Sequence, residues 1–401
     1  MSTNYNPSSV TTGLIMYLDA SNPKSYNPAE NLLTYSEDTS NYQYIENASV
    51  TTNTITSPDN TVTADTLTSS VTGGSNTCLV QKYLAVSANT QTYTFSVFLR
   101  AGTSPTTTIN MQLAGGTYQQ SVATITWSSN TITSSSGGTS YITSYGNGWY
   151  RVGITLTNNG TNNAAYPRVY VKDQGTSNVS GQTVYVWGWQ LETGGYMNTY
   201  TPVTTTSTIT RSTTWTDLTG NGYNATLSNT YFVSSESGGV FETQGVSGSY
   251  ISQSTLNLSS TNYTVITATR YAAASPRGRM LNGRSNNWLL GNWSGTTENY
   301  YAEGWVSAVS AGTADTTWRI LAGTGHITGD VYSMYINGTN NILNNTGGSQ
   351  GPYGITVGVN GYSPTTELSL GRCSFVMAYN RVLSATEINQ NFNALRGRFG
   401  I

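Results

Sequence analysis

The side chains that most enzymes use for chemistry are scarce in this chain of 401 residues. It has one histidine, His326, and two cysteines, Cys78 and Cys373, beside 18 Asp+Glu and 16 Lys+Arg. A zinc site needs several Cys or His ligands, and a Ser-His-Asp triad would have to use His326. That residue lies in a Gly-Thr-Gly-His-Ile-Thr-Gly segment, typical of a loop or strand end. We therefore expect it to be a surface polar residue, and we expect no catalytic residues.

Carboxylates are the remaining catalytic option, because glycosidases work with a pair of Asp or Glu side chains. The acids of this chain are isolated, and the closest pairs, Glu37-Asp38 and Glu298 with Glu303, lack the spacing of a pair on one strand. A pair assembled from separate strands remains an alternative. It would make the protein a polysaccharide depolymerase, to be tested at Glu298, Glu303 and Asp315.

Aromatic residues are abundant: 29 Tyr, 9 Trp and 7 Phe. Flat aromatic faces stack on sugar rings, and polar loop residues bind sugar hydroxyls. The alternative for each ring is a place in the core, since large aromatics are mostly buried. Trp187 and Trp189 are expected to share one buried strand face. The candidate sugar-binding aromatics are Trp288, Trp293, Tyr300, Tyr301, Trp305 and Trp318, with Trp149, Trp187 and Trp189 as further candidates.

One segment offers oxygen ligands for calcium, the only cofactor that the sequence suggests. Asp217, Asn221 and Asn224 lie within DLTGNGYN, and carboxylate and amide oxygens suit that ion. The alternative is a tight Asn-Gly turn in which Asp217 caps backbone amides. We favour the turn.

Three arginines, Arg277, Arg279 and Arg284, are concentrated in RGRMLNGR. They suit an acidic glycan or a neighbouring subunit. Surface ion pairing is the commoner role for such residues.

Composition excludes several classes of protein. Charged residues make up 8% of the chain, against about 25% in an average soluble protein, and the net charge is -2. Sixteen scattered cations do not provide the basic patch that nucleic acid requires. No apolar run approaches the roughly 20 residues of a membrane helix. The start, MSTNYNPSSVTTG, lacks the basic and apolar regions of a secretory signal. We therefore expect no nucleic-acid binding, no membrane insertion and no export.

Alternation of apolar and polar residues predicts an all-β fold. Segments such as 93–99, 149–156, 183–191 and 263–271 are rich in β-formers, and turn signals such as Asn-Gly separate the runs. Many short strands at regular spacing indicate sandwiches or jelly rolls. One short helix is expected at the C-terminal end, where Ser384-Ala-Thr-Glu387 forms a capping box before an apolar stripe. The helix either closes a sandwich or docks onto a partner protein.

Two stretches resemble the concanavalin-A-like (laminin-G-like) domains of tailed-phage structural proteins, particularly of the cyanophage type. The first pairs residues 13–26, GLIMYLDASNPKSY, with residues 214–227, TWTDLTGNGYNATL. The second is the ending, AYNRVLSATEI at 378–388 followed by NFNALRGRFGI at 391–401. Residues 288–305 are also similar to these proteins.

The long gap between the two parts of the first stretch indicates an inserted domain. Loops tolerate insertion of a domain whose own termini lie close together. We expect a discontinuous host domain of residues 1–28 and 208–401 around a guest of residues 29–207. The guest resembles the carbohydrate-binding-module jelly rolls of phage fibres. Cys78 and Cys373 then lie in different domains, so no disulfide is expected.

The resemblance implies a non-enzymatic phage virion structural protein. We expect an exterior capsid decoration or appendage subunit, located on the virion surface after synthesis in the host cytoplasm, with weak lectin-like attachment to host surface glycan. The implied partners are other virion proteins, and a homo-oligomer is expected. The alternatives are a tail-fibre or receptor-binding adhesin that recognises host polysaccharide, and the depolymerase described above.

Overall fold

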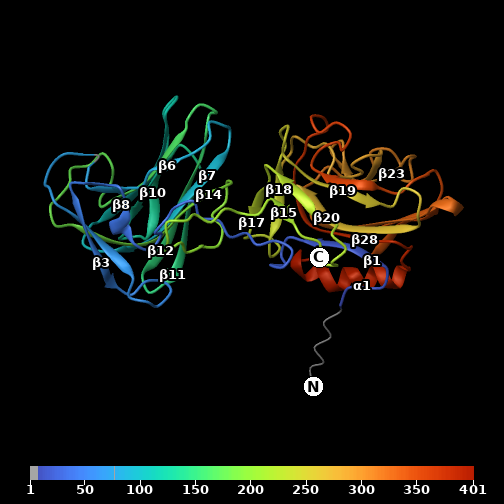
Figure 1. Ribbon diagram of the computed structural model, residues 1–401, viewed down its shortest axis with the longest axis horizontal. Coiled ribbons are helices and arrows are strands. Elements are labelled where there is room, and N and C mark those ends of the chain that lie inside the picture. The colour runs from blue at the N-terminus through green and yellow to red at the C-terminus, as the bar shows by residue number, and fades with distance from the viewer. Residues whose placement is uncertain (1–7, 76) are drawn as a thin grey trace, which may run out of the picture. The chain divides into compact units, whose positions relative to one another are not determined.

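The computed structural model describes residues 8–75 and 77–401, and it shows an all-β protein built from β-sandwiches (Figure 1). The chain forms two compact units, one of residues up to Pro28 with Ser212–Ile401 and one of Ala29–Arg211. The inserted unit ends at Arg211, four residues later than the expected residue 207. The reason is a short bridge in which the Asn31 and Ile209 backbones exchange hydrogen bonds of 2.8 and 3.0 Å, which keeps residues 208–211 with the inserted unit.

The discontinuous unit contains two antiparallel sheets. An eight-stranded sheet has the order β17-β18-β28-β20-β24-β25-β26, and β1 also pairs with β28. Its strands are β1 Leu14–Asp19, β17 Tyr231–Val233, β18 Val240–Gln244, β20 Tyr263–Tyr271, β24 Arg319–His326, β25 Val331–Ile336, β26 Thr339–Asn345 and β28 Leu370–Tyr379. A seven-stranded sheet has the order β15-β16-β19-β27-β21-β22-β23. Its strands are β15 Thr214–Trp215, β16 Ala225–Ser228, β19 Tyr250–Asn257, β21 Leu281–Asn282, β22 Trp288–Trp293, β23 Thr296–Ala302 and β27 Tyr353–Val357.

The main core of this unit lies between its two sheets. Val265 and Val376 of the eight-stranded sheet and Leu290 and Val357 of the seven-stranded sheet belong to one buried cluster. The opposite face of the eight-stranded sheet carries a second apolar cluster, in which Phe375 and Met377 lie with Ile388 and Leu395 of the C-terminal helix. Apolar residues thus occupy both faces of the eight-stranded sheet. The outer face of the seven-stranded sheet differs, and it carries the site described below.

Helix α1, Ala385–Leu395, closes the second cluster, as Figure 1 shows beside β1 and β28. Ser384 is its N-cap, and the capping box with Glu387 is present. The expected short C-terminal helix is therefore confirmed, and its apolar stripe packs on this unit's own sheet. Short 3-10 helices occupy Thr39–Asn41, Ile327–Gly329 and Arg396–Arg398.

The inserted unit is also a pair of antiparallel sheets. The seven-stranded sheet has the order β10-β9-β8-β13-β5-β2, with β6 on β13, and the six-stranded sheet has the order β11-β12-β7-β14-β4-β3. A buried cluster that includes Val97, Ile109, Val169 and Leu191 lies between them. The strands are β2 Tyr44–Glu46, β3 Ala48–Ile55, β4 Ala64–Ser69, β5 Leu79–Gln81, β6 Leu84–Ala85, β7 Thr92–Ala101, β8 Thr106–Ala114, β9 Gln119–Thr126, β10 Thr131–Ser136, β11 Ser140–Gly146, β12 Trp149–Thr157, β13 Ala164–Tyr170 and β14 Thr183–Thr193.

Trp187 and Trp189 lie on opposite faces of β14, contrary to the expectation of one shared face. The pairing of β14 with β7 shifts register between Trp187 and Gln190, and Gly188 has φ +60°. Such a bulge adds one residue to the strand and so reverses the alternation of side chains. Trp189 therefore enters the core between the sheets, and Trp187 packs with Phe98 in a separate cluster.

Both cysteines are buried thiols, Cys78 in the inserted unit and Cys373 in the discontinuous one. Within residues 8–75 and 77–401, helices long and apolar enough to traverse a lipid bilayer do not occur.

Candidate functional site

Two of the predicted sugar-binding aromatics belong to the core instead. Trp288 and Tyr300 are both 0% exposed. The Trp288 Nε1 donates a hydrogen bond to the Tyr263 hydroxyl at 2.9 Å, and that hydroxyl lies 2.7 Å from the Tyr300 hydroxyl. Because neither ring reaches the surface, the prediction is wrong for both, and their role is to fill the core and satisfy its polar atoms.

Trp318 is partly exposed but has a structural role on the other sheet. It packs with the cluster that α1 covers, and its ring centroid lies 5.0 Å from that of Phe399. Its Nε1 donates a hydrogen bond of 2.6 Å to Glu236, and the Arg270 guanidinium stacks on it at 5.3 Å. The indole is thus engaged by three groups within the protein.

Trp293 and Trp305 remain, and they form an aromatic cluster with Tyr301. All three are partly exposed. Ring centroids are 5.3 Å apart between Trp293 and Trp305 and 5.1 Å apart between Trp305 and Tyr301. Trp293 ends β22, and Trp305 follows β23, where its backbone forms a bridge with Tyr301. A short bend after β23 thus returns the chain so that the rings meet.

The cluster borders the outer face of the seven-stranded sheet of this unit. Leu281, Leu290 and Tyr300 point into the core. Their neighbours alternate to the other side, where Thr356, Asn282, Leu289 and Tyr301 occupy one row across β27, β21, β22 and β23. This alternation is what positions Tyr301 outside while Tyr300 is buried.

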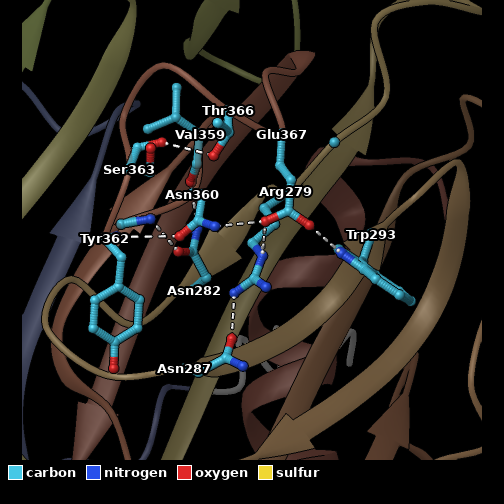
Figure 2. A network of polar contacts seen from close by, with 12 residues as sticks. Arg279, Asn282, Asn287, Trp293, Val359, Asn360, Tyr362, Ser363, Thr366 and Glu367 are labelled. Carbon is cyan, nitrogen blue, oxygen red and sulfur yellow. Dashed lines mark hydrogen bonds and ion pairs between the residues drawn. The ribbon is translucent and has the colours of Figure 1, made fainter.

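Glu367 fixes the aromatic cluster to the loop that precedes β28 (Figure 2). Its Oε1 accepts a 2.7 Å hydrogen bond from the Trp293 Nε1, and its Oε2 accepts one of 2.7 Å from the Asn360 side chain. The Arg279 Nε forms an ion pair with the same carboxylate at 2.7 Å. Two hydrogen-bond donors and the ion pair with Arg279 hold this carboxylate, and through it they restrict the Trp293 ring.

Arg279 extends the network to a second glutamate. The Arg279 Nη1 donates to the Asn287 Oδ1 at 2.7 Å, and the Asn287 backbone N–H donates to the Glu303 Oε1 at 2.5 Å. Partial burial and the neighbouring Glu303 carboxylate raise the pKa of Tyr362, a ring that is 56% exposed. Tyr362 therefore stays a neutral hydroxyl at physiological pH and can donate or accept a hydrogen bond.

Both glutamates have a strained backbone. Glu303 has φ +57° and Glu367 has φ +47°, in the left-handed region that residues with a side chain seldom adopt. Such a conformation costs on the order of 1–3 kcal/mol and persists only where the surroundings impose it. Here the carboxylate contacts impose it.

The loop of residues 358–369 is packed closely on the sheet. The Asn282 side chain donates to the Val359 carbonyl at 2.8 Å and accepts from the Gly361 N–H at 2.9 Å. A Cβ atom at Gly361 would lie 2.0 Å from the Gly283 carbonyl oxygen, so only glycine permits this approach. Within the loop, the Thr366 hydroxyl donates to the Ser363 carbonyl at 3.0 Å (Figure 2). The loop thus carries Tyr362 and Glu367 on a rigid support.

The Asp217 segment has the structure of the predicted turn. The Asp217 carboxylate accepts hydrogen bonds from the Tyr17, Thr219 and Tyr223 backbone N–H groups and from the Thr219 hydroxyl. The Asn224 Oδ1 accepts from the Asp217 N–H at 2.8 Å, and the Asn221 amide donates to the Ile15 carbonyl at 2.9 Å. These oxygens serve backbone donors. Within residues 8–75 and 77–401 no group of three or more His, Cys, Asp or Glu could hold a metal ion.

The arginine tract and the tested acids are engaged in internal contacts. Arg277 donates to the Ala273 carbonyl at 2.7 Å, and Arg284 donates to Ser252 and to the Gly361 carbonyl at 3.1 and 3.0 Å. Asp315 and Glu298 both pair with Arg319, at 2.8 and 3.7 Å. Among the three arginines of the tract and the three acids Glu298, Glu303 and Asp315, only Arg279 and Glu303 take part in the hydrogen-bond chain that runs from Glu367 through Asn287.

The remaining candidates are structural. His326 is exposed at the end of β24, where its Nδ1 accepts a hydrogen bond from the Gly329 N–H at 3.0 Å and caps a 3-10 turn. In the inserted unit Trp149, Trp187 and Trp189 are 1%, 4% and 0% exposed. Each indole nitrogen donates to an internal oxygen, from Thr56, Thr63 and Thr39 respectively.

No protein-family model and no curated protein matches this sequence. Among solved structures, the binding domain of Paraclostridial Mosquitocidal Protein 1 is 16% identical over 45% of this chain and 49% of that chain, with a TM-score of 0.35. Trypanosoma rangeli sialidase is 15% identical over 45% of this chain and 30% of that chain, with a TM-score of 0.34. Domain 4 of AbnA, a GH43 arabinanase from Geobacillus stearothermophilus, is 16% identical over 44% of this chain and 91% of that chain, with a TM-score of 0.33. The match thus spans about half of the length of the first of these chains and less than a third of the second.

Proposed function

We propose that the chain is a non-catalytic glycan-binding protein and that the aromatic cluster with its polar network forms a sugar-binding surface. The observation that carries the proposal is the pair of partly exposed rings, Trp293 and Trp305, 5.3 Å apart beside hydrogen-bonding groups. Indole faces stack on the apolar faces of sugar rings, and nearby amides and hydroxyls bind the ring substituents. Tyr362 supplies such a hydroxyl at the same surface.

Fixed side chains favour binding because little conformational entropy is lost. An immobilised side chain would otherwise cost about 0.5–1.5 kcal/mol on binding. The Trp293 ring is held by Glu367, and Glu367 in turn by Arg279 and Asn360. The surface is therefore organised before a ligand arrives.

Three carboxyl groups of this unit have pKa values shifted in the direction opposite to the one that hydrolysis needs. Glycoside hydrolysis needs an acid that stays protonated near neutral pH, which requires a raised pKa. Hydrogen bonds from Arg319 lower the pKa of Asp315, and those from Arg381 lower that of Glu387 to about 2. Burial acts to raise the pKa of Glu236, but the Arg372 and Arg270 charges and the hydrogen bonds to this carboxylate together outweigh burial and lower the pKa. Each of these acids is a charged ion-pair partner.

A virion surface is the setting that the sequence resemblance favours. Many copies on one particle would convert weak single-site binding into useful avidity. As a capsid decoration or appendage subunit the chain would contact other virion proteins and form a homo-oligomer. As a tail-fibre adhesin it would use the same rings to recognise host polysaccharide.

The decisive experiment compares the wild-type chain with Trp305→Ala on an array of neutral and charged oligosaccharides, followed by calorimetry with the glycans that bind. Trp318→Phe is the matched control, because that indole is partly exposed on the other sheet. We expect Trp305→Ala to weaken binding at least tenfold and the control to match the wild type. Unchanged binding in Trp305→Ala would refute the proposed surface.

The two settings are separated by co-sedimentation. The protein is mixed with host cell envelopes in one assay and with phage capsids stripped of it in another. Binding to capsids alone supports decoration. Binding to envelopes that free sugar displaces supports an adhesin.

A further inference from the structure

The outer face of the seven-stranded sheet in the inserted unit is polar across its central strands. In β8, Ile109, Met111 and Leu113 are buried in the core between the sheets. The intervening residues, Thr108, Asn110 and Gln112, alternate to the other face. The same alternation in β13 turns Val169 inward and Tyr166, Arg168 and Tyr170 outward.

Strand register aligns these outward residues in rows. Tyr44 of β2 pairs with Gln81 of β5, Gln81 with Arg168 of β13, and Arg168 with Asn110 of β8. Residues directly opposite one another on neighbouring strands project to the same face and contact each other. Four polar or aromatic side chains, contributed by strands far apart in the sequence, therefore form one continuous row.

An open cavity of about 310 Å³ lies over this face. Its lining consists mainly of side-chain amides and phenols, with one positively charged and one negatively charged side chain. The lining residues are Tyr44, Glu46, Leu79, Gln81, Gln112, Arg168, Tyr170 and Gln174. The volume is at the lower end of the roughly 300–1,000 Å³ of ligand sites, so it suits a short segment of a ligand.

Polar groups on this face, both lining the cavity and beside it, are held in place by one another. The Asn110 amide donates to the Gln120 and Gln174 side-chain oxygens, at 3.2 Å each. The Tyr118 hydroxyl donates to the same Gln120 oxygen at 2.8 Å, and the Arg168 Nε donates to Gln81. Such mutual contacts fix the direction in which each amide presents its donor and acceptor.

One acceptor in this hydrogen-bond network, the Asn110 Oδ1, has no partner among the described residues. Asn110 is 0% exposed, and its Oδ1 makes no hydrogen bond within the part of the chain that the structure describes. A buried polar atom without a partner is unfavourable, because it has given up its hydrogen bonds to water without replacement. Native proteins seldom retain such an atom without a reason, and a donor supplied by a buried water is one.

Tyrosines border the polar face. Tyr44, Tyr83 and Tyr118 are 46%, 46% and 54% exposed. The rings of Tyr83 and Tyr166 lie 5.6 Å apart, and the Arg168 guanidinium is 5.9 Å from the Tyr166 ring. Exposed rings beside fixed amides present the two kinds of contact that a sugar needs.

We infer that this face is a second binding site, independent of the aromatic cluster, for a short segment of a neutral polyhydroxylated chain, that is, an oligosaccharide. Carboxamides bind hydroxyl groups in either direction, because each carries both donors and acceptors. Arg168 and Glu46 balance each other's charge, so the lining does not select an ion. The site goes beyond the surface proposed above and would make each chain bivalent.

The test uses the full-length chain with the first site removed. Three variants are compared on the same oligosaccharide array. The first carries Trp305→Ala alone. The second adds Arg168→Ala and Tyr44→Ala to it, and the third adds Arg100→Ala instead. Arg100 is the matched control because it lies on β7, in the other sheet of the unit. Thermal melting checks that each variant is folded, and Gln112→Ala replaces any variant that is not.

We expect Trp305→Ala to retain binding to a set of neutral glycans. The affinity for these glycans should fall about tenfold or more when Arg168 and Tyr44 are also changed, and it should not fall with Arg100→Ala. The loss follows from removal of a charge-assisted hydrogen bond, which is worth about tenfold or more in affinity. The inference is overturned if Trp305→Ala binds no glycan, binds acidic glycans alone, or binds as well without Arg168 and Tyr44. If Trp305→Ala keeps all binding of the wild type and that binding is lost with Arg168 and Tyr44, the first surface fails while the second stands.

Discussion

The Trp293 indole donates a 2.7 Å hydrogen bond to Glu367, so the last residue of β22 is tied to the loop that leads into β28. The glutamate also pairs with Arg279, which precedes β21. One carboxylate therefore connects three segments that are distant in the sequence. The consequence is that the orientation of an exposed ring depends on a residue that need not contact a ligand.

Replacing Glu367 with glutamine should loosen this connection. The Glu367→Gln variant would lose the ion pair with Arg279 and one of the two strong acceptors at this position, at a cost of about 1 kcal/mol because the pair is partly exposed. We expect faster hydrogen exchange in residues 358–369 and weaker glycan binding. Glu298→Gln is the control, since its 3.7 Å pair with Arg319 lies outside the network. Equal exchange in the two variants would contradict the role of Glu367.

Alanine at Gly361 should displace the same loop by a different route. Its Cβ would meet the Gly283 carbonyl at 2.0 Å, so the backbone must move. We expect a loss of stability of more than about 1 kcal/mol, as steric conflicts in packed regions produce, measured by urea denaturation. Gly397→Ala is the matched control, because no atom lies within 4 Å of the added Cβ. A wild-type midpoint in Gly361→Ala would show that the loop is not closely packed.

The sequence predicts the elements of this fold better than it predicts their faces. β20 spans Tyr263–Tyr271 and helix α1 begins after Ser384, as expected, because alternation and capping are local signals. Trp288 and Trp293 illustrate the limit. Both faces of β22 contain apolar residues, Leu289 on one and Leu290 on the other, so the pattern does not reveal which face points to the core.

The polar face of the inserted unit was missed for a related reason. The alternation of Thr108, Asn110 and Gln112 with apolar residues is visible in the sequence. Its alignment with Tyr44, Gln81 and Arg168 depends on the strand order β2-β5-β13-β8. Those strands are not consecutive, and no local signal specifies which of them become neighbours.

Removing the N-cap of α1 should weaken the discontinuous unit. The Ser384 hydroxyl accepts a 3.3 Å hydrogen bond from the Glu387 N–H, and Glu387 accepts one of 2.9 Å from the Ser384 N–H. Loss of a serine cap costs about 1 kcal/mol. We expect Ser384→Ala to lower the melting temperature and Thr386→Ala, exposed in the same turn, to leave it near the wild type. A drop of equal size in both would mean that the cap is not the cause.

The stability of the inserted unit should fall as pH rises from about 4.5 to 7, chiefly because of Glu192. Burial raises the pKa of this carboxyl from 4.5 to about 7, although hydrogen bonds from Asn198 and the Arg151 charge oppose the shift. Between these two values the folded state binds a proton that the unfolded state releases, so raising the pH favours unfolding. The contribution is fully present below the unfolded value and is lost by about pH 7, with an upper bound of roughly 3 kcal/mol.

Urea denaturation of the full chain at several pH values measures this dependence. We expect Glu192→Gln to flatten it, since a glutamine side chain does not titrate and can retain the contact with the Asn198 N–H. Glu46→Gln, on the surface of the same unit, should keep the slope of the wild type. A slope that persists in Glu192→Gln would assign the effect to the other carboxyls whose pKa burial raises, Glu30, Glu37 and Asp65.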